Sequence, residues 1–357
     1  MFQLLQYASV FLAFSSFAVA AETGRRVKCT AKVVRKPWDM LTSKERSAYI
    51  DAELCLMAAP SQLNIPGTET RWDDLHWNHI VQANFIHDVG QFLPWHRYYI
   101  AVHGDLLRNE CGYTGPLPYW DETADSTLPS LESASIFQPD AFGGNGVGSG
   151  PQKYIADGPF ANSTLHLKRL GVAPADYKIY RDLNARTLIG GAQATIDACF
   201  QISTYTAAWE CWAGLPHSSG HGATGGLMVD VVLSPGDPVF YLHHGWLDAM
   251  WWKWQSLDLP NRLKDMGGRN IPRESYVGNI GLPLPGPEWT NHDGDDGSVT
   301  TLDHVLYMSD MYPNVTVADV MDVRGDVVCA EYFYNDSFTF TMSRIVDGII
   351  VFDTIIS

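Results

Sequence analysis

Histidines carry the strongest chemical signal in this 357-residue chain. Nine of its twelve histidines fall into two clusters, and imidazole nitrogens in that number indicate a transition-metal site. The cluster members are His76, His79, His87, His96 and His103 in the first, and His217, His221, His243 and His244 in the second. We expect the three solitary histidines to be ordinary surface or core residues.

The second cluster contains an HxxxH pair. His217 and His221 are four residues apart, so on a helix they share one face and can bind one metal ion. The zinc-protease motif requires a glutamate directly after the first histidine, and Ser218 stands there instead. The pair therefore indicates a metal site, but not that kind of protease.

Both clusters suit a metal that accepts nitrogen ligands only. His79, His87 and His96 are too far apart for one helical face, but a helix, a loop and a second helix can bring them together. Two sites of three neutral imidazoles argue against calcium, magnesium and structural zinc, and favour copper. Two adjacent copper ions can bind and reduce dioxygen together.

The elements that must position these residues are mainly helical. We predict helices over 41–57, with Thr42 and Glu45 as a capping box, over about 72–86, over 95–110 and from about 244 through 254. The last thirty residues are more strand-like. With no repeat and no clear linker, one mainly α domain with irregular loops and a small C-terminal strand part is expected.

Two motifs resemble the copper signatures of tyrosinases, catechol oxidases and haemocyanins. They are HDVGQFLPWHR, which begins at His87, and DPVFYLHHGWLD, which ends at Asp248. ECGY at 110–113 and PYWD at 118–121 also resemble the short secreted fungal members. The resemblance covers roughly residues 40 to 255. It implies a four-helix core that carries two copper ions.

The resemblance implies a specific ligand set. His79, His87 and His96 would bind the first copper, and His217, His221 and His244 the second. His244 is selected over His243 because the family's ligand precedes the signature aspartate by four positions. His76 is the rival of His79. His103 would be a packing or supporting residue, and His243 and Asp248 would support the ligands from behind.

Further site residues follow from the same resemblance. Val231 aligns with a position at the mouth of the substrate pocket, although an ordinary core valine is the alternative. Glu210 is a candidate for the acid that positions a water during phenol deprotonation. Ser218 stands where efficient monophenol hydroxylases often carry asparagine.

Three positions depart from the family pattern. Gly104 replaces a usual glutamate, and Ala249 replaces the arginine that usually follows the signature aspartate. Many members link a cysteine to the ring of the second histidine, but Phe85 occupies that position here, so no such thioether can form.

Composition and targeting signals limit the classes of function that this chain can have. The chain has 24 basic and 40 acidic residues, a net charge of −16, which disfavours nucleic-acid binding and a basic membrane-surface anchor. Residues 1–20 read as a secretory signal peptide, leaving 21–357 as the mature domain without a membrane anchor. Six cysteines predict three disulfides, with Cys199–Cys211 as the natural local pair. Sequons mark Asn162, Asn314 and Asn335 for glycosylation in the secretory pathway.

The expected activity is oxidation of phenols by O₂. We expect chiefly o-diphenol conversion to o-quinone, with monophenol ortho-hydroxylation by the same site, or a tailoring step on a phenolic or tyrosine-containing metabolite. Haemocyanin-like oxygen binding without turnover is the alternative. The departures also fit a third reading, a redox-silent protein that keeps the fold, although six intact ligands oppose it. The oligomeric state stays open.

Overall fold

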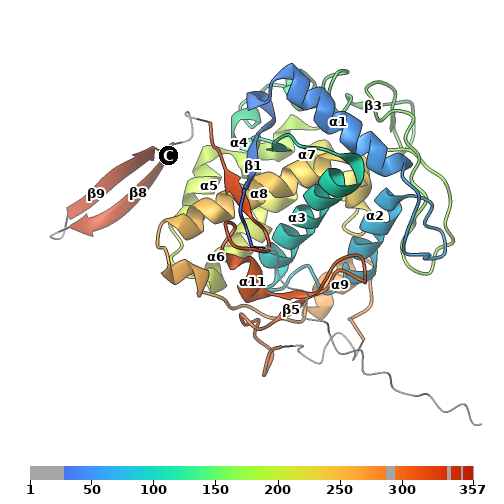
Figure 1. Ribbon diagram of the computed structural model, residues 1–357. Helices are drawn as coiled ribbons and strands as arrows, with labels where there is room; N and C mark the ends of the chain where they lie inside the picture. Colours follow the sequence, from blue (N-terminus) through green and yellow to red (C-terminus); the bar gives the residue numbers. More distant parts are fainter. Residues whose placement is uncertain (1–27, 287–293, 336–338, 347–348, 357) are drawn as a thin grey trace, which may run out of the picture.

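Four helices form the centre of the protein. The computed structural model describes residues 28–286, 294–335, 339–346 and 349–356. The central helices are α2 (Arg71–Gln82), α3 (Phe92–Cys111), α7 (Leu215–Thr224) and α8 (Val239–Ser256). Helix α8 packs against both α3 and α7 in the middle of the molecule (Figure 1). The mainly helical prediction with a four-helix core is confirmed.

Helix α8 is buried from Val239 to Gln255. Leu247, Met250, Trp251 and Trp254 recur at helical spacing, as predicted, and all four are buried. The helix begins at Val239, five residues before the predicted start, directly after Pro238. A proline is well suited to a helix start because it needs no intrahelical N–H partner there.

The other helix boundaries differ from prediction for local reasons. Helix α1 (Ser43–Ala58) has the predicted capping box of Thr42 and Glu45. Helix α3 begins at Phe92, since Pro94 is tolerated in a first turn. Helix α2 ends at Gln82, four residues early, because the amides of Phe85 and Ile86 both turn back to its carbonyl. This turn brings His87 towards the helix that it has just left.

Short helices and strands surround the centre. The helices are α4 (Glu122–Asp125), α5 (Gln193–Phe200), α6 (Tyr205–Ala213), α9 (Glu274–Asn279) and α11 (Val317–Met321). A parallel sheet has the order β2 (Leu117–Tyr119), β1 (Val33–Pro37) and β7 (Ala330–Tyr332). Three separate antiparallel pairs are also present: β3 (Gly146–Val147) with β4 (Tyr154–Ile155), β5 (Val305–Leu306) with β6 (Val315–Thr316), and β8 (Thr339–Val346) with β9 (Ile349–Ile356).

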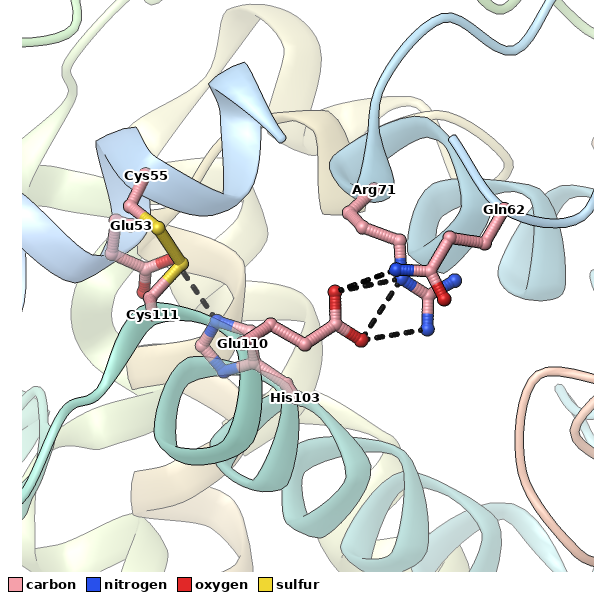
Figure 2. The surroundings of a disulfide bond; sticks show 7 residues. All are labelled: Glu53, Cys55, Gln62, Arg71, His103, Glu110 and Cys111. Atoms are coloured by element: carbon pink, nitrogen blue, oxygen red, sulfur yellow. Dashed lines mark hydrogen bonds and ion pairs between the residues drawn. A yellow bond between two sulfur atoms is a disulfide. The ribbon is translucent and has the colours of Figure 1, made fainter. Parts of the chain in front are cut away.

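The structure contains three disulfides, as predicted. Cys199–Cys211 is the expected local pair, and Cys55–Cys111 links α1 to the end of α3 (Figure 2). The third bond, Cys29–Cys329, spans 300 positions and lies beside the contact between β1 and β7. All six cysteines are therefore paired, and none remains for a thioether.

The structure describes the three predicted glycosylation sites but not the predicted signal peptide. The side chains of Asn162 and Asn314 lie at exposed positions, which leaves them accessible to glycosylation, and Asn335 is half-buried. Residues 1–20 lie outside the described part of the chain. Within the described residues, no helix combines the length and the apolar character needed to span a bilayer.

Candidate metal centre

Three elements bring the first histidine group together. His79 lies on α2, His87 in the turn after it and His96 on α3. Their ring centroids are 5.1, 5.2 and 5.9 Å apart, and their ligand atoms converge within 4.8 Å. This is the helix, loop and helix arrangement expected from the sequence.

The second histidine group comes from α7 and α8. His217 and His221 lie one turn apart on α7 with ring centroids 4.6 Å apart, and His244 on α8 lies 5.2 and 5.5 Å from them. His243 belongs to the same group by distance. The structure thus brings all six predicted ligands into two sets of three, together with one additional imidazole.

Backbone carbonyls orient five of these rings. A carbonyl oxygen can only accept, so each bonded Nδ1 carries the proton and the lone pair remains on Nε2. The pairs are His79 with Val232 O at 3.1 Å, His87 with Ala83 O at 2.9 Å, His96 with Phe92 O at 2.8 Å, His217 with Ala213 O at 3.3 Å and His221 with Met228 O at 2.7 Å.

Several of the remaining ring nitrogens have no hydrogen-bond partner among the residues that the structure describes. Nε2 of His79, His96 and His217 and both ring nitrogens of His244 are buried without a hydrogen bond. Each buried polar atom without a hydrogen bond costs about 1–3 kcal/mol of folding free energy, so a cluster of such atoms indicates that a ligand binds there. Lone pairs that converge from two sets of three imidazoles fit two metal ions that prefer nitrogen ligands.

Burial keeps these imidazoles neutral. It lowers the pKa of His87 to about 4 and the pKa values of the other five well below 6.5, and neighbouring histidines add to the effect at His79 and His244. A metal ion binds the unprotonated ring, so the site is ready for metal at neutral pH.

The two groups face each other. The rings of His96 and His244 stack with centroids 4.3 Å apart and planes 9° from parallel. The rings of His87 and His217 lie 6.4 Å apart in a second contact across the gap. The arrangement is a single binuclear site and not two separate mononuclear ones.

Two neighbouring cavities with shared lining residues open onto this site. One of about 330 Å³ is lined by Glu210, Trp209 and Arg273, and one of about 280 Å³ by Ser218, Val231 and Met228. Both reach His87 and His217. A small aromatic molecule can therefore approach the metal positions from solvent.

Comparison with known proteins decides the family. The profile of the common central domain of tyrosinase matches residues 69–257, a span of more than half of the chain within which all six predicted ligands lie. The chain belongs to the tyrosinase family. It is accordingly a copper oxidoreductase, and the family's centre is binuclear copper, which the two histidine groups fit.

Relatives and solved structures agree with this membership. The chain is 31% identical to the tyrosinase-like protein phomQ1 of Diaporthe leptostromiformis, over 85% of this chain and 78% of that one. It is 31% identical to N-acetyl-6-hydroxytryptophan oxidase of Emericella nidulans, over 84% and 92%. A polyphenol oxidase variant from Thermothelomyces thermophila superposes with a TM-score of 0.68 at 26% identity, covering 85% of this chain and 89% of that one. A functional unit of octopus haemocyanin shares the fold at 19% identity and a TM-score of 0.51, covering 90% and 82%.

His243 has a partner that sequence analysis missed. Its Nδ1 bonds to the carboxylate of Glu122 on α4, and both side chains are fully buried. Burial raises the pKa of Glu122 and lowers that of His243 to about 3. Gly220 makes room for this pair, because a Cβ there would lie 2.2 Å from His243 Nδ1. Glu122 directly follows the PYWD motif, and no spacing rule connects it to a histidine 121 residues later.

Asp248 has a different role from the predicted one. We expected this carboxylate to orient the His244 ring, but its oxygens bind Arg97 at 2.6 Å and Arg35 at 3.1 Å, together with the hydroxyl of Tyr332. Both ring nitrogens of His244 remain without a partner. Asp248 therefore supports the copper centre by joining helices and not by holding an imidazole.

Two histidines near the copper centre lie outside both groups. His76 is fully buried one turn before His79 but does not join either metal group in the described residues. His103 bonds to Glu53 at 3.0 Å and stacks on Tyr241 at 3.9 Å, as Figure 2 shows for the Glu53 pair. His103 thus packs behind the centre, as expected from the sequence.

Structure also explains one departure from the family pattern. A Cβ at Gly104 would lie 2.4 Å from the end of the Leu117 side chain, so a larger residue at this position requires that side chain to shift.

The candidate acid and the candidate serine line different cavities. Glu210 is 53% exposed, binds Arg269 at 2.7 Å and lines the first cavity. Ser218 and Val231 line the second. His217 lines both cavities, so each candidate residue borders a cavity that reaches a ligand of the proposed second copper.

Proposed function

We propose that this protein is a secreted oxidase that converts o-diphenols into o-quinones with O₂, and that hydroxylates monophenols more slowly. The observation that carries the proposal is the pair of facing histidine groups beneath two cavities that reach His87 and His217. Because the metal positions are open to solvent, a phenol can come within bonding distance of a bound ion.

The proposed ligands are those implied by the sequence. His79, His87 and His96 would hold one copper, and His217, His221 and His244 the other. Bound copper would supply the redox chemistry, in which two diphenols lose two electrons and two protons each and one O₂ is reduced to two waters.

The protein's own residues position the phenol and manage its proton. Val231 and Met228 give the second cavity an apolar wall against which an aromatic ring can pack, while Ser218 adds a hydroxyl near His217. Glu210 uses Oε1 to bind Arg269, which leaves Oε2 to hold a water that accepts the phenolic proton. We propose Glu210 and Ser218 as catalytic residues and Val231 as a pocket residue on this basis.

A tailoring role is the second part of the proposal. The relative from Emericella nidulans is named as an oxidase of N-acetyl-6-hydroxytryptophan, a substituted phenolic amino acid. The two cavities of about 330 and 280 Å³ offer room for such a substituent beyond the reacting ring. We infer a phenol with a side group, either in a secondary metabolite or in a tyrosine-containing peptide.

Catechol turnover tests the proposed function. The copper-loaded protein should consume O₂ with catechol and release quinone, and the variant His96→Ala should not. Reversible O₂ binding without quinone would identify an oxygen carrier of the haemocyanin kind. Failure of both at full copper occupancy would exclude the proposal and leave a redox-silent protein.

Secretion needs a separate experiment. Three disulfides are typical of proteins that fold in an oxidising compartment. The mature protein recovered from culture medium should begin at Ala21 and carry glycans on Asn162, Asn314 or Asn335. An intracellular protein that retains Met1 would contradict this part of the proposal.

A further inference from the structure

A third group of metal-binding side chains lies away from the copper centre. Glu69, His166 and Asp176 bring one ligand atom each within 4.8 Å of one another. Glu69 stands just before α2, and the other two belong to the segment 165–177. None of them lines the cavities at the copper centre.

A buried carboxylate fixes the imidazole of this group. Asp73 Oδ2 lies 2.7 Å from His166 Nδ1 and also accepts the backbone amides of Glu69 and Thr70, each at 2.9 Å. The Asp73 side chain is only 1% exposed. Since this carboxylate acts as an acceptor, His166 Nδ1 carries the proton and the lone pair is on Nε2. A carboxylate that orients a histidine from behind is a recurrent arrangement at metal sites.

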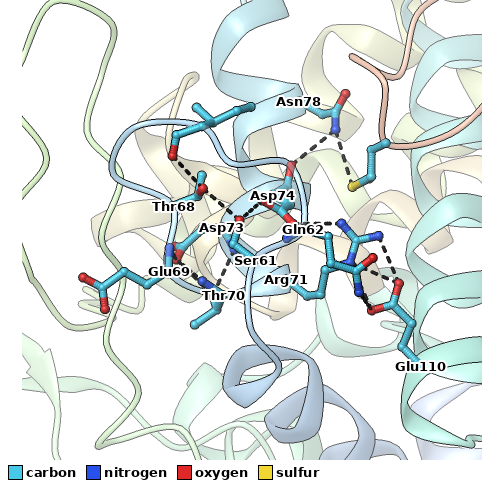
Figure 3. Close-up of polar contacts among 12 residues, drawn as sticks. Ser61, Gln62, Thr68, Glu69, Thr70, Arg71, Asp73, Asp74, Asn78 and Glu110 are labelled. Carbon is cyan, nitrogen blue, oxygen red and sulfur yellow. Dashed lines mark hydrogen bonds and ion pairs between the residues drawn. The ribbon is translucent and has the colours of Figure 1, made fainter.

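The distance on the other side of the ring matches a shared ion. His166 Nε2 lies 3.5 Å from Glu69 Oε2, which is too long for a hydrogen bond. Two ligands placed ~2.1 Å from a tetrahedral metal are ~3.4 Å apart. Figure 3 shows the Glu69 side chain directed away from the Asp74 and Arg71 network, so its carboxylate takes no part in that network.

Backbone bonds hold the third ligand, Asp176, close to the imidazole. Leu165 and Tyr177 exchange amide–carbonyl bonds of 2.8 and 2.9 Å, and the Ala175 amide binds the His166 carbonyl at 3.1 Å. These bonds close the segment into a loop and place Asp176 beside His166. Lys168, two residues after His166, lies over the Tyr177 ring at 3.4 Å.

We propose that Glu69, His166 and Asp176 bind a Zn²⁺ ion, with water completing the coordination. One imidazole and two carboxylates suit zinc, whereas the nitrogen-only groups suit copper. The ion would tie the 165–177 loop to the start of α2, the helix that carries His79. The same loop reaches the pocket wall, because Arg169 binds Asp230 beside Val231 at 2.9 and 3.1 Å.

Metal counting on the copper-loaded protein tests the site. After removal of excess copper, the full chain is equilibrated with micromolar Zn²⁺, and both elements are measured by mass spectrometry. We expect two copper ions and one zinc ion per chain. The double variant Glu69→Gln/Asp176→Asn should keep both copper ions and bind zinc at least tenfold more weakly. These exposed side chains can be changed without disturbing the buried His166–Asp73 bond.

A matched control and a spectrum make the test decisive. Asp51→Asn/Asp140→Asn removes two exposed acids elsewhere and should bind zinc like the wild type. Zinc X-ray absorption should show one imidazole among oxygen ligands. Equal zinc binding by the wild type and the Glu69→Gln/Asp176→Asn protein, or a spectrum with several imidazoles, would overturn the proposal. A third copper in place of zinc would overturn zinc as the occupant.

Discussion

Arg97 Nε lies 2.6 Å from Asp248 Oδ1, and the two side chains are 0% and 4% exposed. Arg97 directly follows His96 on α3, and Asp248 lies one turn after His244 on α8. This ion pair therefore fixes the spacing of the two helices whose histidine rings stack across the binuclear site. Arg35 at the second carboxylate oxygen extends the same anchor to β1.

Asp248→Asn should destabilise the protein strongly. The change leaves two buried guanidinium groups beside a neutral amide, and breaking a buried ion pair costs about 3–5 kcal/mol of unfolding free energy. Denaturant unfolding measures the loss, with Asp51→Asn as an exposed control expected to fall within about 0.5 kcal/mol of the wild type. A loss below 1 kcal/mol would show that the pair does not hold the helices together.

His244→Ala should remove more copper than His243→Ala. His244 has no hydrogen-bond partner and faces His96, whereas His243 is already bound to Glu122. We expect about one copper per chain and no catechol oxidation for the first variant, and near two coppers for the second. Elemental analysis of the purified proteins decides this, and the reverse order would assign the ligand role to His243.

Gly220→Ala should disturb the centre, while Gly222→Ala on the same helix should not. A Cβ at position 220 would lie 2.2 Å from His243 Nδ1 and 2.6 Å from Glu122 Oε1, whereas at position 222 its nearest neighbour would be 3.6 Å away. Both changes gain up to about 1 kcal/mol of helix propensity, so the propensity cancels in the comparison. Melting temperature and copper content should both fall only for Gly220→Ala; equal behaviour of the two variants would refute the close packing of the pair.

Ser218→Asn should raise monophenol hydroxylation relative to diphenol oxidation. The amide offers a donor and an acceptor to a water near His217, where serine has one hydroxyl. Base assistance to deprotonation is worth about 10²–10⁴-fold, so even partial assistance is measurable. Rates for paired phenols and catechols at matched copper occupancy give the ratio, and an unchanged ratio would direct attention to Val231.

His76 should make the metal-free protein sensitive to acid. Burial lowers the pKa of His76 to about 4 in the folded chain, below the ordinary value of 6.5. Between these values the unfolded chain binds a proton that the folded chain does not, so stability falls as the pH falls through this range. Lowering the pH from 7 to 4 should therefore reduce the unfolding free energy of the wild type more than that of His76→Gln. A difference between the two proteins that does not change with pH would mean that His76 titrates normally.

Short-range patterns predicted the elements and most of the site. HxxxH spacing on α7, the capping box of α1 and the apolar repeat of α8 are local properties, and each is present as expected. The grouping of His79, His87 and His96 was also predicted, because the resemblance to the tyrosinase family assigns all three to one copper ion.

Long-range pairings were not predictable in the same way. Asp248 could be assigned to the neighbouring His244 from spacing alone, yet its partners come from α3 and β1. Glu122 meets His243 only because α4 packs against α7 at a glycine. Such contacts depend on which elements lie side by side, and residue spacing within one helix carries no information about that.

The Cys29–Cys329 bond makes nearly the whole described chain a closed covalent ring. A protease that cuts one exposed peptide bond between these cysteines opens the ring without releasing a fragment. The nicked molecule keeps both pieces attached and migrates with its full mass until the disulfides are reduced. Damage to a surface loop in an extracellular setting therefore leaves the four central helices tethered to one another.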